Sequence, residues 1–424
     1  MSHGHNHHAA SKSLFEQRGN FYLKASPVAR GAVVFCILVG IISIVMGMKS
    51  GFSTRVWGAI VFNTFFFFAI SLGGSAFSAM QDILSTKWGR PVMRLHESFS
   101  SFLPVAALIF FSTLLCVKFD IAGARNVWVW IANPDMLHHF WGKRTWLSEN
   151  SWLIRDAVAI GIILLLAGWQ MRLKIGRDRA MAAGRHEEAV KLGKSAYEKL
   201  RYWSAPLLVC YAITFSLLGF DLLMSLAPTW LSTLWGGWLF AIMMQTLMAS
   251  LLITMWVFKD TAIGLHIRQQ QFHDVGKLMH GFTIFFAYLT YAHVLTYWYG
   301  NMPEETQYFI ARLEQPWIFI VLGAPIFSFL LPLYTMIPKA AKWTKMVGGT
   351  IAIGILMAQW ATFLLVVQPQ VVAPADMTLP WVEIGAFFGV FGLFIMSIFT
   401  FGSKIPMVAI GDPLLHEAID AGHH

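Results

Sequence analysis

Charged side chains are scarce in this sequence. Asp, Glu, Lys and Arg make up 12% of its 424 residues, whereas hydrophobic residues make up 57%. A soluble domain carries about 25% charged residues, so the composition indicates an integral membrane protein with little room for a soluble domain. The net charge of +9 does not indicate a nucleic-acid-binding protein, because basic cytoplasmic loops of a membrane protein produce the same excess.

Cysteine is almost absent. Cys36, Cys116 and Cys210 lie far apart inside apolar runs, and none of them belongs to a CxxC or CxxCH motif. Covalent c-type haem and iron–sulfur clusters require such spacings. We therefore expect no covalently bound cofactor and no cluster, and we expect the thiols to be buried structural groups.

A cleavable signal peptide is not expected either. Residues 1–27 are polar and rich in histidine, and the first apolar run begins only after them, so that run is predicted to stay as a membrane anchor. The N-terminal histidines, like His423 and His424, are expected to be solvated rather than to form a metal site.

Long apolar runs dominate the remaining sequence, residues 28–403. Ten of them are long enough to cross a bilayer as helices, so the predicted fold is an all-α integral membrane protein with about ten transmembrane helices. The predicted spans are Val28–Met48, Trp57–Met80, Phe99–Phe119, Trp152–Met171, Ala205–Leu226, Leu231–Phe258, Leu278–Tyr299, Pro316–Ile337, Val347–Val367 and Trp381–Phe401.

The basic residues predict the orientation in the membrane. An even number of spans places both termini on one side. Of the 31 Lys and Arg residues, 23 fall in the tails or in the connections on that side. The positive-inside rule therefore predicts that both termini, the tail 404–424 and the basic hairpin 172–203 are cytoplasmic. The longest connection on the other face, Lys118–Ser151 with His138 and His139, is expected to be a docking surface for an extracytoplasmic partner.

The seventh predicted span carries a polar stripe, and we expect much of the chain to be organised around it. His280, Thr283, Thr290, His293 and Tyr297 recur at spacings that place them on one side of a helix. Such a stripe is costly against lipid, so it is predicted to face protein or water.

Other ionisable residues stand near or inside the spans. Asp221, close to the end of the fifth span, is either a proton-transfer group or a structurally paired carboxylate. His96 and Glu97, at the start of the third span, belong either to an interfacial ion pair or to a proton entry site. Arg155 and Asp156 are adjacent in sequence and are expected to pair with each other.

The second span carries small polar residues on one face, including Ser71, Ser75 and Asp82. They are interpreted either as a helix-packing face or as one wall of a hydrated path.

Three segments resemble a known family. They are FAY at residues 286–288 followed by WYGNMPEET at 298–306, FDLLMSLAPTWLST at 220–233, and SWLIRDAV at 151–158. Together they are similar to the ActF-type, NrfD-like (polysulfide-reductase-type) membrane subunits of bacterial alternative complex III. Two positions depart from the family pattern: His293 stands where Gln is common, and His280 where an apolar residue is common. Both add titratable groups to the seventh span.

The resemblance implies two four-helix bundles, spans 2–5 and 6–9, with spans 1 and 10 peripheral. It implies a subunit of a respiratory quinol:cytochrome c-type oxidoreductase in the bacterial inner membrane that contributes to proton translocation, quinol binding or both. Menaquinol or another quinol is the ligand it implies. The expected partners are a second NrfD-like subunit, an iron–sulfur subunit, multihaem cytochrome c subunits and membrane lipids, so haem and iron–sulfur clusters belong to those partners.

The resulting hypothesis is a proton path that starts at His96 and Glu97, follows His280, Thr290 and His293, and ends at Asp221. Two alternatives remain. A secondary transporter is disfavoured because no inverted repeat is evident. A haem b anchor could use His280 and His293, thirteen residues apart, but no other span offers matching histidines.

Overall fold

The computed structural model describes residues 21–137, 141–373 and 379–420. His138, His139 and the terminal histidines lie outside these described residues. All regular secondary structure within them is helical, and ten helices are long and apolar enough to cross a membrane. The predicted all-α membrane fold with ten spans is therefore confirmed.

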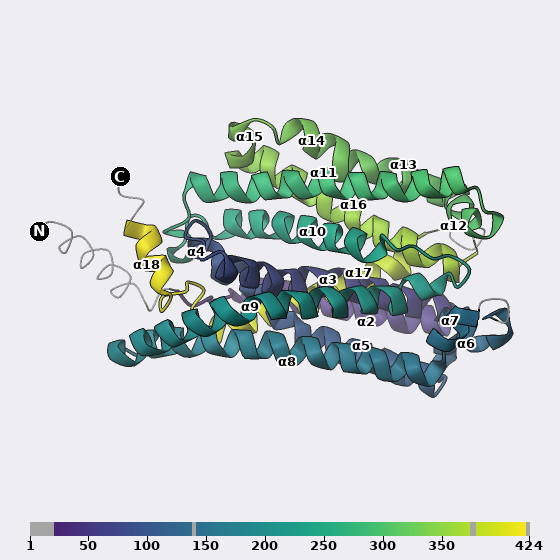
Figure 1. Ribbon diagram of the computed structural model, residues 1–424, viewed down its shortest axis with the longest axis horizontal. Coiled ribbons are helices and arrows are strands. Elements are labelled where there is room, and N and C mark those ends of the chain that lie inside the picture. Colours follow the sequence, from purple (N-terminus) through teal and green to yellow (C-terminus); the bar gives the residue numbers. More distant parts are fainter. Residues whose placement is uncertain (1–20, 138–140, 374–378, 421–424) are drawn as a thin grey trace, which may run out of the picture.

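The spanning helices run roughly parallel along one axis of the molecule (Figure 1). They are α2 (Pro27–Lys49), α3 (Ser53–Ile83), α4 with η2 and α5 (Arg90–Phe99, Ser100–Phe102, Leu103–Lys118), α8 (Glu149–Ala182), α9 (His186–Leu222), α10 (Trp235–Phe258), α11 (Gln269–Gly300), α13 with η7 and α14 (Trp317–Pro325, Ile326–Leu330, Leu331–Thr335), α16 (Lys345–Val371) and α17 (Trp381–Lys404).

Short helices close the two ends of this body. One end, here called the proximal end, holds both described chain ends and the helices α4, η6 (Ala262–Gly264), α15 (Lys339–Trp343) and α18 (Pro413–Asp420) (Figure 1). The opposite, distal end holds η3 (Ile121–Val127), α6 (Val129–Ala132), η4 (Pro134–Leu137), α7 (Trp141–Trp146), η5 (Met224–Leu226) and α12 (Pro303–Leu313).

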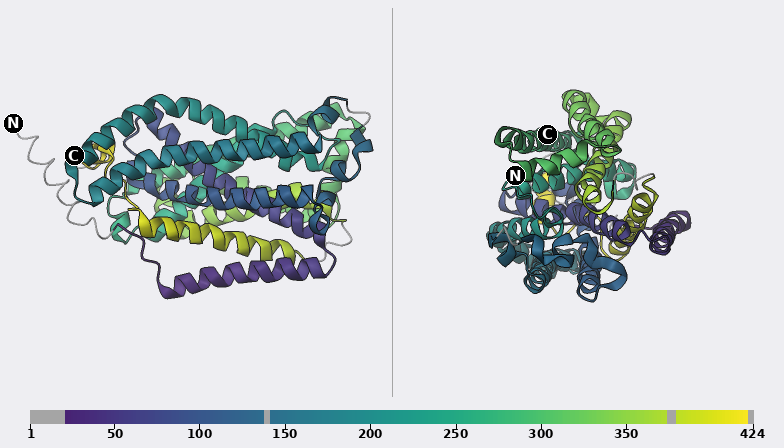
Figure 2. Two further views of the ribbon diagram at one scale, coloured as in Figure 1. Left: turned by 90° about the horizontal axis from the view of Figure 1, so that it is seen from below. Right: turned by 90° about the vertical axis from the view of Figure 1, so that its right-hand side faces the viewer.

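The helices pack as two bundles with a peripheral pair. The first bundle contains α3, α4–α5, α8 and α9, and the second contains α10, α11, α13–α14 and α16. Helix α10 packs on α3, α4 and α9 as well as on α11, so it lies between α11 and the first bundle. Helices α2 and α17 pair with each other, and α17 covers α3, leaving α2 at the edge of the molecule (Figure 2).

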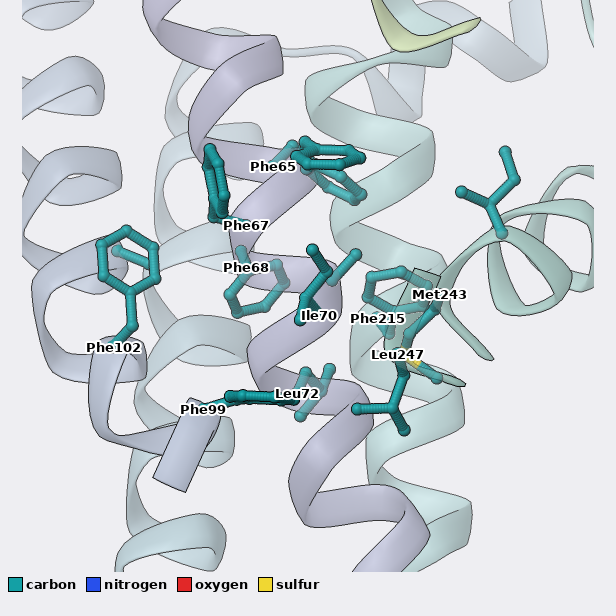
Figure 3. Close-up of a cluster of buried hydrophobic side chains, with 14 of the residues drawn as sticks. Phe65, Phe67, Phe68, Ile70, Leu72, Phe99, Phe102, Phe215, Met243 and Leu247 are labelled. Atoms are coloured by element: carbon teal, nitrogen blue, oxygen red, sulfur yellow. The ribbon is translucent and has the colours of Figure 1, made fainter. Parts of the chain in front are cut away.

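Helix α3 is the central helix, because nearly all of its residues are buried. Its phenylalanines form the middle of the hydrophobic core together with side chains from α5, α9 and α10 (Figure 3). Helix α11 was expected to hold this position, but it buries only one face and exposes large side chains such as Tyr288 and Trp298 on the other.

The α2–α17 pair depends on glycine. A Cβ atom added to Gly40 in α2 would lie 2.3 Å from the Cα atom of Gly389 in α17. Backbone atoms cannot move away as a flexible side chain can, so only glycine permits this approach.

The Gly40→Val substitution is therefore expected to destabilise the protein by roughly 1–3 kcal/mol through overpacking. Thermal unfolding in detergent measures the effect. Gly31→Val on the same helix is the control, because a Cβ atom at Gly31 meets no other atom within 4 Å. Equal melting temperatures for the two variants would contradict the close packing.

Candidate functional site: two buried ionisable clusters in the first bundle

A network of buried ion pairs occupies the proximal end of the first bundle. Helix α8 continues past Met171, where the predicted span stopped, and carries Lys174, Arg177 and Asp178 into the protein. All members of this proximal network have side chains that are at most 6% exposed. Its four cations and four carboxylates balance in charge: Arg90, Arg94, Lys174, Arg177, Asp82, Glu97, Asp178 and Asp412.

Lys174 is the centre of the proximal network. Its Nζ atom lies 2.6 Å from Oδ2 of Asp82 and 2.8 Å from Oε1 of Glu97. The second oxygen of Glu97 lies 2.8 Å from Nη1 of Arg94. Ser78 donates a hydrogen bond to Glu97 and accepts one from Lys174. Glu97 is thus inside the protein rather than in a solvated pair at the membrane surface.

His96 lies beside this network and contacts different groups. Its Nδ1 atom is 3.1 Å from the carbonyl oxygen of Gly74, and its Nε2 atom is 3.2 Å from the side-chain nitrogen of Gln81. The ring also packs edge-on against Phe77. The adjacent residues His96 and Glu97 therefore project into one buried region of α3, α4 and α8.

The C-terminal segment completes the network instead of forming a free tail. Asp412 accepts hydrogen bonds from Nη1 of Arg90 at 3.1 Å and Nη2 of Arg177 at 2.7 Å. Burial alone would raise the pKa of Asp412, but the charges of Arg177, Arg90 and Lys174 lower it to about 2. Because the pKa is lowered in the folded state, the ionised carboxylate stabilises the fold at neutral pH.

The Asp412→Asn variant is expected to be less stable at neutral pH by about 2 kcal/mol. In the wild-type protein, the stabilisation that the Asp412 carboxylate contributes is fully present above its unfolded-state pKa of 3.8. It is lost as the pH falls through about 2. The difference between the two proteins should therefore shrink in acid, which unfolding measurements across that range would reveal. A difference that stays constant with pH would contradict this account.

Hydrogen-bonded polar side chains continue from the network toward the middle of the first bundle. The Ser75 hydroxyl on α3 donates to the Ser100 hydroxyl at 2.8 Å, and the Ser75 carbonyl oxygen accepts from the side-chain amide of Gln170 at 3.2 Å. The Tyr211 hydroxyl on α9 donates to the side-chain oxygen of Gln170 at 3.3 Å. Ser71, by contrast, bonds back to the carbonyl of its own helix at Phe67.

An aromatic layer separates these groups from the distal end. Phe65 and Phe68 of α3 pack against Phe215 of α9 (Figure 3), with ring centroids 5.6 and 6.2 Å apart. The ring of Phe110 on α5 lies 5.4 Å from that of Phe68. Along α9 the order is Tyr211, Phe215 and then Asp221. Ten residues of helix place Tyr211 and Asp221 about 15 Å apart along the axis.

Asp221 lies beyond this layer and is fully buried. Its Oδ2 atom accepts a hydrogen bond from Nε of Arg155 at 2.5 Å, and its Oδ1 atom accepts one from the indole of Trp146 at 3.0 Å. The guanidinium of Arg155 also stacks 4.0 Å above the Trp146 ring. The predicted pairing of Arg155 with Asp156 is therefore wrong. Arg155 reaches across to Asp221 on α9 instead.

Asp156 faces Asp221 instead, and the two form what is here called the distal acid pair. The two carboxyls are within hydrogen-bonding reach of each other. Neither oxygen of Asp156 receives a hydrogen bond from another described group, although the residue is fully buried. Arg155 is the one cation paired with the two acids within the described part of the chain, so the distal acid pair contains one more acid than cation.

A cavity of about 350 Å³ opens beside Asp221 at the distal end. Most of its wall is apolar or aromatic, including Trp146, Phe220 and Trp230. Lys143 reaches it from α7 and donates to the backbone carbonyls of Pro228 and Trp230. Burial lowers the pKa of Lys143, an effect that Glu305 opposes.

The polar stripe of α11 faces protein along most of its length, but in the second bundle. Thr283 accepts from the amide of Gln245 at 2.9 Å, and Thr290 accepts from the indole of Trp238 at 2.9 Å. His293 is buried and lies 2.7 Å from the hydroxyl of Ser232. His280 is half-buried, and its Nδ1 atom has no hydrogen-bond partner among the described residues.

The structure therefore brings together only parts of the hypothesised path. Helix α10 separates the α11 residues from His96 and Glu97, and its Met243 and Leu247 meet α3 at Gly73. Glu97 and Asp82 both pair with Lys174. Ser75 forms hydrogen bonds with Ser100 and Gln170, closer to the middle of the bundle. Of the residues interpreted as a wall of a hydrated path on α3, Ser75 and Asp82 contribute their side chains. Ser71 contributes only its backbone carbonyl oxygen, which accepts a hydrogen bond from Ser100.

Sequence reasoning missed Lys174, Gln170, Tyr211 and Asp412. Helical spacing could have found the first of these, because Trp152, Asp156, Gln170 and Lys174 lie on the same buried face of α8. No family model matches the chain. No curated protein is significantly similar to it. Within the described residues, no group of three or more His, Cys, Asp or Glu side chains is placed to hold a metal ion.

Proposed function

We propose that this chain is a proton-transferring membrane subunit of a respiratory quinol oxidoreductase of the alternative complex III type. The resemblance of three segments to ActF-type subunits supplies the type of complex. The two buried ionisable clusters of the first bundle supply the chemistry. The carboxylates of both clusters are buried, in a fold where unpaired charges are expensive.

The distal acid pair is the observation that carries this proposal. Asp156 and Asp221 share one cation, and Asp156 has no other hydrogen-bond donor among the described residues. The pair can therefore hold one proton and release it when its surroundings change. A purely structural ion pair requires only one of the two acids.

The proposed route differs from the path through α11. Protons enter at the proximal network around Lys174 and Glu97 and continue along Ser75, Gln170 and Tyr211. The aromatic layer around Phe215 interrupts this chain, so water has to enter the layer before a proton reaches the acid pair. Oxidation of quinol in a partner subunit supplies the free energy for that change.

The partners in this proposal are a second NrfD-like subunit, an iron–sulfur subunit and multihaem cytochrome c subunits. They hold the haem and the clusters. The complex resides in the bacterial inner membrane, with the proximal end of this chain in the cytoplasm, because most Lys and Arg residues lie at that end.

Native purification from the source membranes tests the assignment. An optical spectrum and mass spectrometry of the purified material should show reducible c-type haem, a large iron–sulfur partner and a second ten-span subunit. A colourless protein that purifies alone would overturn the proposal and favour a transporter.

Quinol binding at the distal cavity is a second candidate function. The cavity volume of about 350 Å³ lies in the range of small-molecule sites, and Asp221 could accept a hydrogen bond from a quinol hydroxyl. A photoreactive quinone should then label the cavity wall, and Trp230→Ala should reduce the labelling. Labelling confined to a partner subunit would exclude this role.

A further inference from the structure

Helix α12 contacts the wall of the distal cavity without contributing a residue to it. The segment 298–306 leads into α12, and the segment 220–233 runs into the loop 227–234 between η5 and α10, here called the wall loop. Tyr308 of α12 stacks on Trp230 of the wall loop, with ring centroids 4.0 Å apart and an angle of 6° between the ring planes. Trp230 is buried and lines the cavity.

Arg312, one turn further along α12, completes this stack. Its guanidinium carbon lies 3.4 Å from the centre of the Tyr308 ring. Two groups this close to the centre of one ring cannot occupy the same face, so Tyr308 lies between Arg312 and Trp230. A cation on one face and an indole on the other are both favourable partners for an aromatic ring.

The outer end of the stack is fixed to the second bundle. The Nε and Nη2 atoms of Arg312 donate to the carbonyl oxygens of Leu365 and Val366 on α16, each at 2.9 Å. Pro369 has no N–H group, so the carbonyl of Leu365 lacks its usual donor within the helix. Arg312 is buried, yet it pairs with no acid among the described residues. The carbonyl groups of a proline-interrupted helix take the place of that acid.

Other side chains hold the wall loop from both bundles. Lys143 of α7 donates to the carbonyl oxygens of Pro228 and Trp230, at 2.7 and 3.2 Å. Tyr297 of α11 donates to the carbonyl oxygen of Leu231. The wall loop forms no regular helix, so its place depends on these contacts. The stack is the contact that holds the Trp230 indole itself.

We propose that Tyr308 and Arg312 are positioning residues of the distal cavity, which hold the indole of Trp230 in its wall and so preserve the space for a quinol ring. The choice of quinol rests on the second candidate function given above, whereas the holding of the wall loop does not depend on any ligand. Loss of the Tyr308 ring should release Trp230 and thereby remove backbone acceptors from Lys143.

Acetylation of Lys143 in the purified full chain tests this role without a ligand. Lys143 is half-buried and donates to two carbonyls of the wall loop, so it should react slowly with an amine-acetylating reagent. Mass spectrometry measures the rate at each lysine. In Tyr308→Leu, Lys143 should react about fivefold faster, the effect expected from losing one stacked pair. Tyr308→Phe keeps the ring and should restore the wild-type rate.

Two further variants extend the comparison. Arg312→Met should also speed the reaction of Lys143, because the stack loses its attachment to α16. It leaves no carboxylate without a partner, since no described acid pairs with Arg312. Tyr299→Leu is the matched control, because Tyr299 is 84% exposed at the same end of the molecule and its loss should leave Lys143 unchanged. Thermal unfolding establishes that each variant is folded, and Tyr308→Met replaces Tyr308→Leu if the latter is misfolded.

Equal reactivity of Lys143 in Tyr308→Leu and Tyr308→Phe would overturn the proposal. Together with a lower melting temperature for Tyr308→Leu, it would show that Tyr308 only stabilises α12.

Labelling by a photoreactive quinone then tests the ligand. Tyr308→Leu should reduce labelling of the cavity wall about fivefold, and Tyr308→Phe should not. If the wild-type cavity is not labelled, the quinol candidate fails, and the reactivity of Lys143 alone decides the positioning role. Wild-type labelling of Tyr308→Leu, in a protein whose Lys143 reacts faster, would overturn the link between the stack and the quinol.

Discussion

The Arg155→Met variant is expected to lose about 3–5 kcal/mol of stability, the cost of removing one partner from a buried ion pair. Arg155 is the cation that pairs with Asp221, whose side chain is fully buried. Without it, two facing carboxyls remain in an apolar environment. Unfolding in mixed detergent micelles measures the loss.

A second substitution separates the ion pair from simple packing. Asp221→Asn in the Arg155→Met background removes the uncompensated charge, so the double variant should recover most of the stability. The control is Arg144→Met, which removes an exposed arginine at the same end of the molecule and should change stability by less than about 0.5 kcal/mol. A double variant as unstable as Arg155→Met alone would show that the charge is not the cause.

The second large effect is expected at Lys174. Replacement by methionine leaves Asp82 and Glu97 without their shared cation, so a loss of about 3–5 kcal/mol is expected here as well. Lys174→Arg retains a positive charge and should restore stability. Arginine does not release its proton in proteins, so Lys174→Arg should fold and assemble but slow proton uptake.

Comparing the three proteins distinguishes a structural role from a functional one. Stability is measured by unfolding, and proton uptake by a pH-sensitive dye during turnover of the reconstituted complex. If Lys174→Arg takes up protons at the wild-type rate, Lys174 serves only to hold the helices together. If it folds normally and uptake slows, the amine takes part in proton transfer.

The ten spans could be predicted because a membrane helix is encoded in a continuous stretch of sequence. Length and hydropathy located all ten spans but not the short helices at the two ends, and α8 and α9 extend beyond the predicted spans into the basic hairpin. Because they are charged, Lys174 and Arg177 were assigned to the cytoplasmic hairpin outside the membrane. In the folded protein they pair with acids from three other segments. No local sequence pattern predicts which acids these are.

Pairing between helices could not be read from sequence. Arg155 stands next to Asp156, yet its partner is Asp221, 66 residues away. Similarly, Asp412 belongs to a segment without a distinctive motif and still contributes a carboxylate to the proximal network. The α11 stripe was predicted to face protein or water, and most of its residues contact protein. The distance between the stripe and Glu97 depends on how the two bundles pack around α10. The spacing of polar residues along one helix does not predict this packing.

The most direct test of the proposed proton route is the proton-to-electron ratio of the complex that carries Asp156→Asn. This substitution leaves the Arg155–Asp221 ion pair in place and removes the acid that lacks a hydrogen-bond donor among the described residues, so the protein should remain folded. We expect normal assembly with a reduced number of protons released for each electron transferred. A wild-type ratio at normal turnover would contradict it.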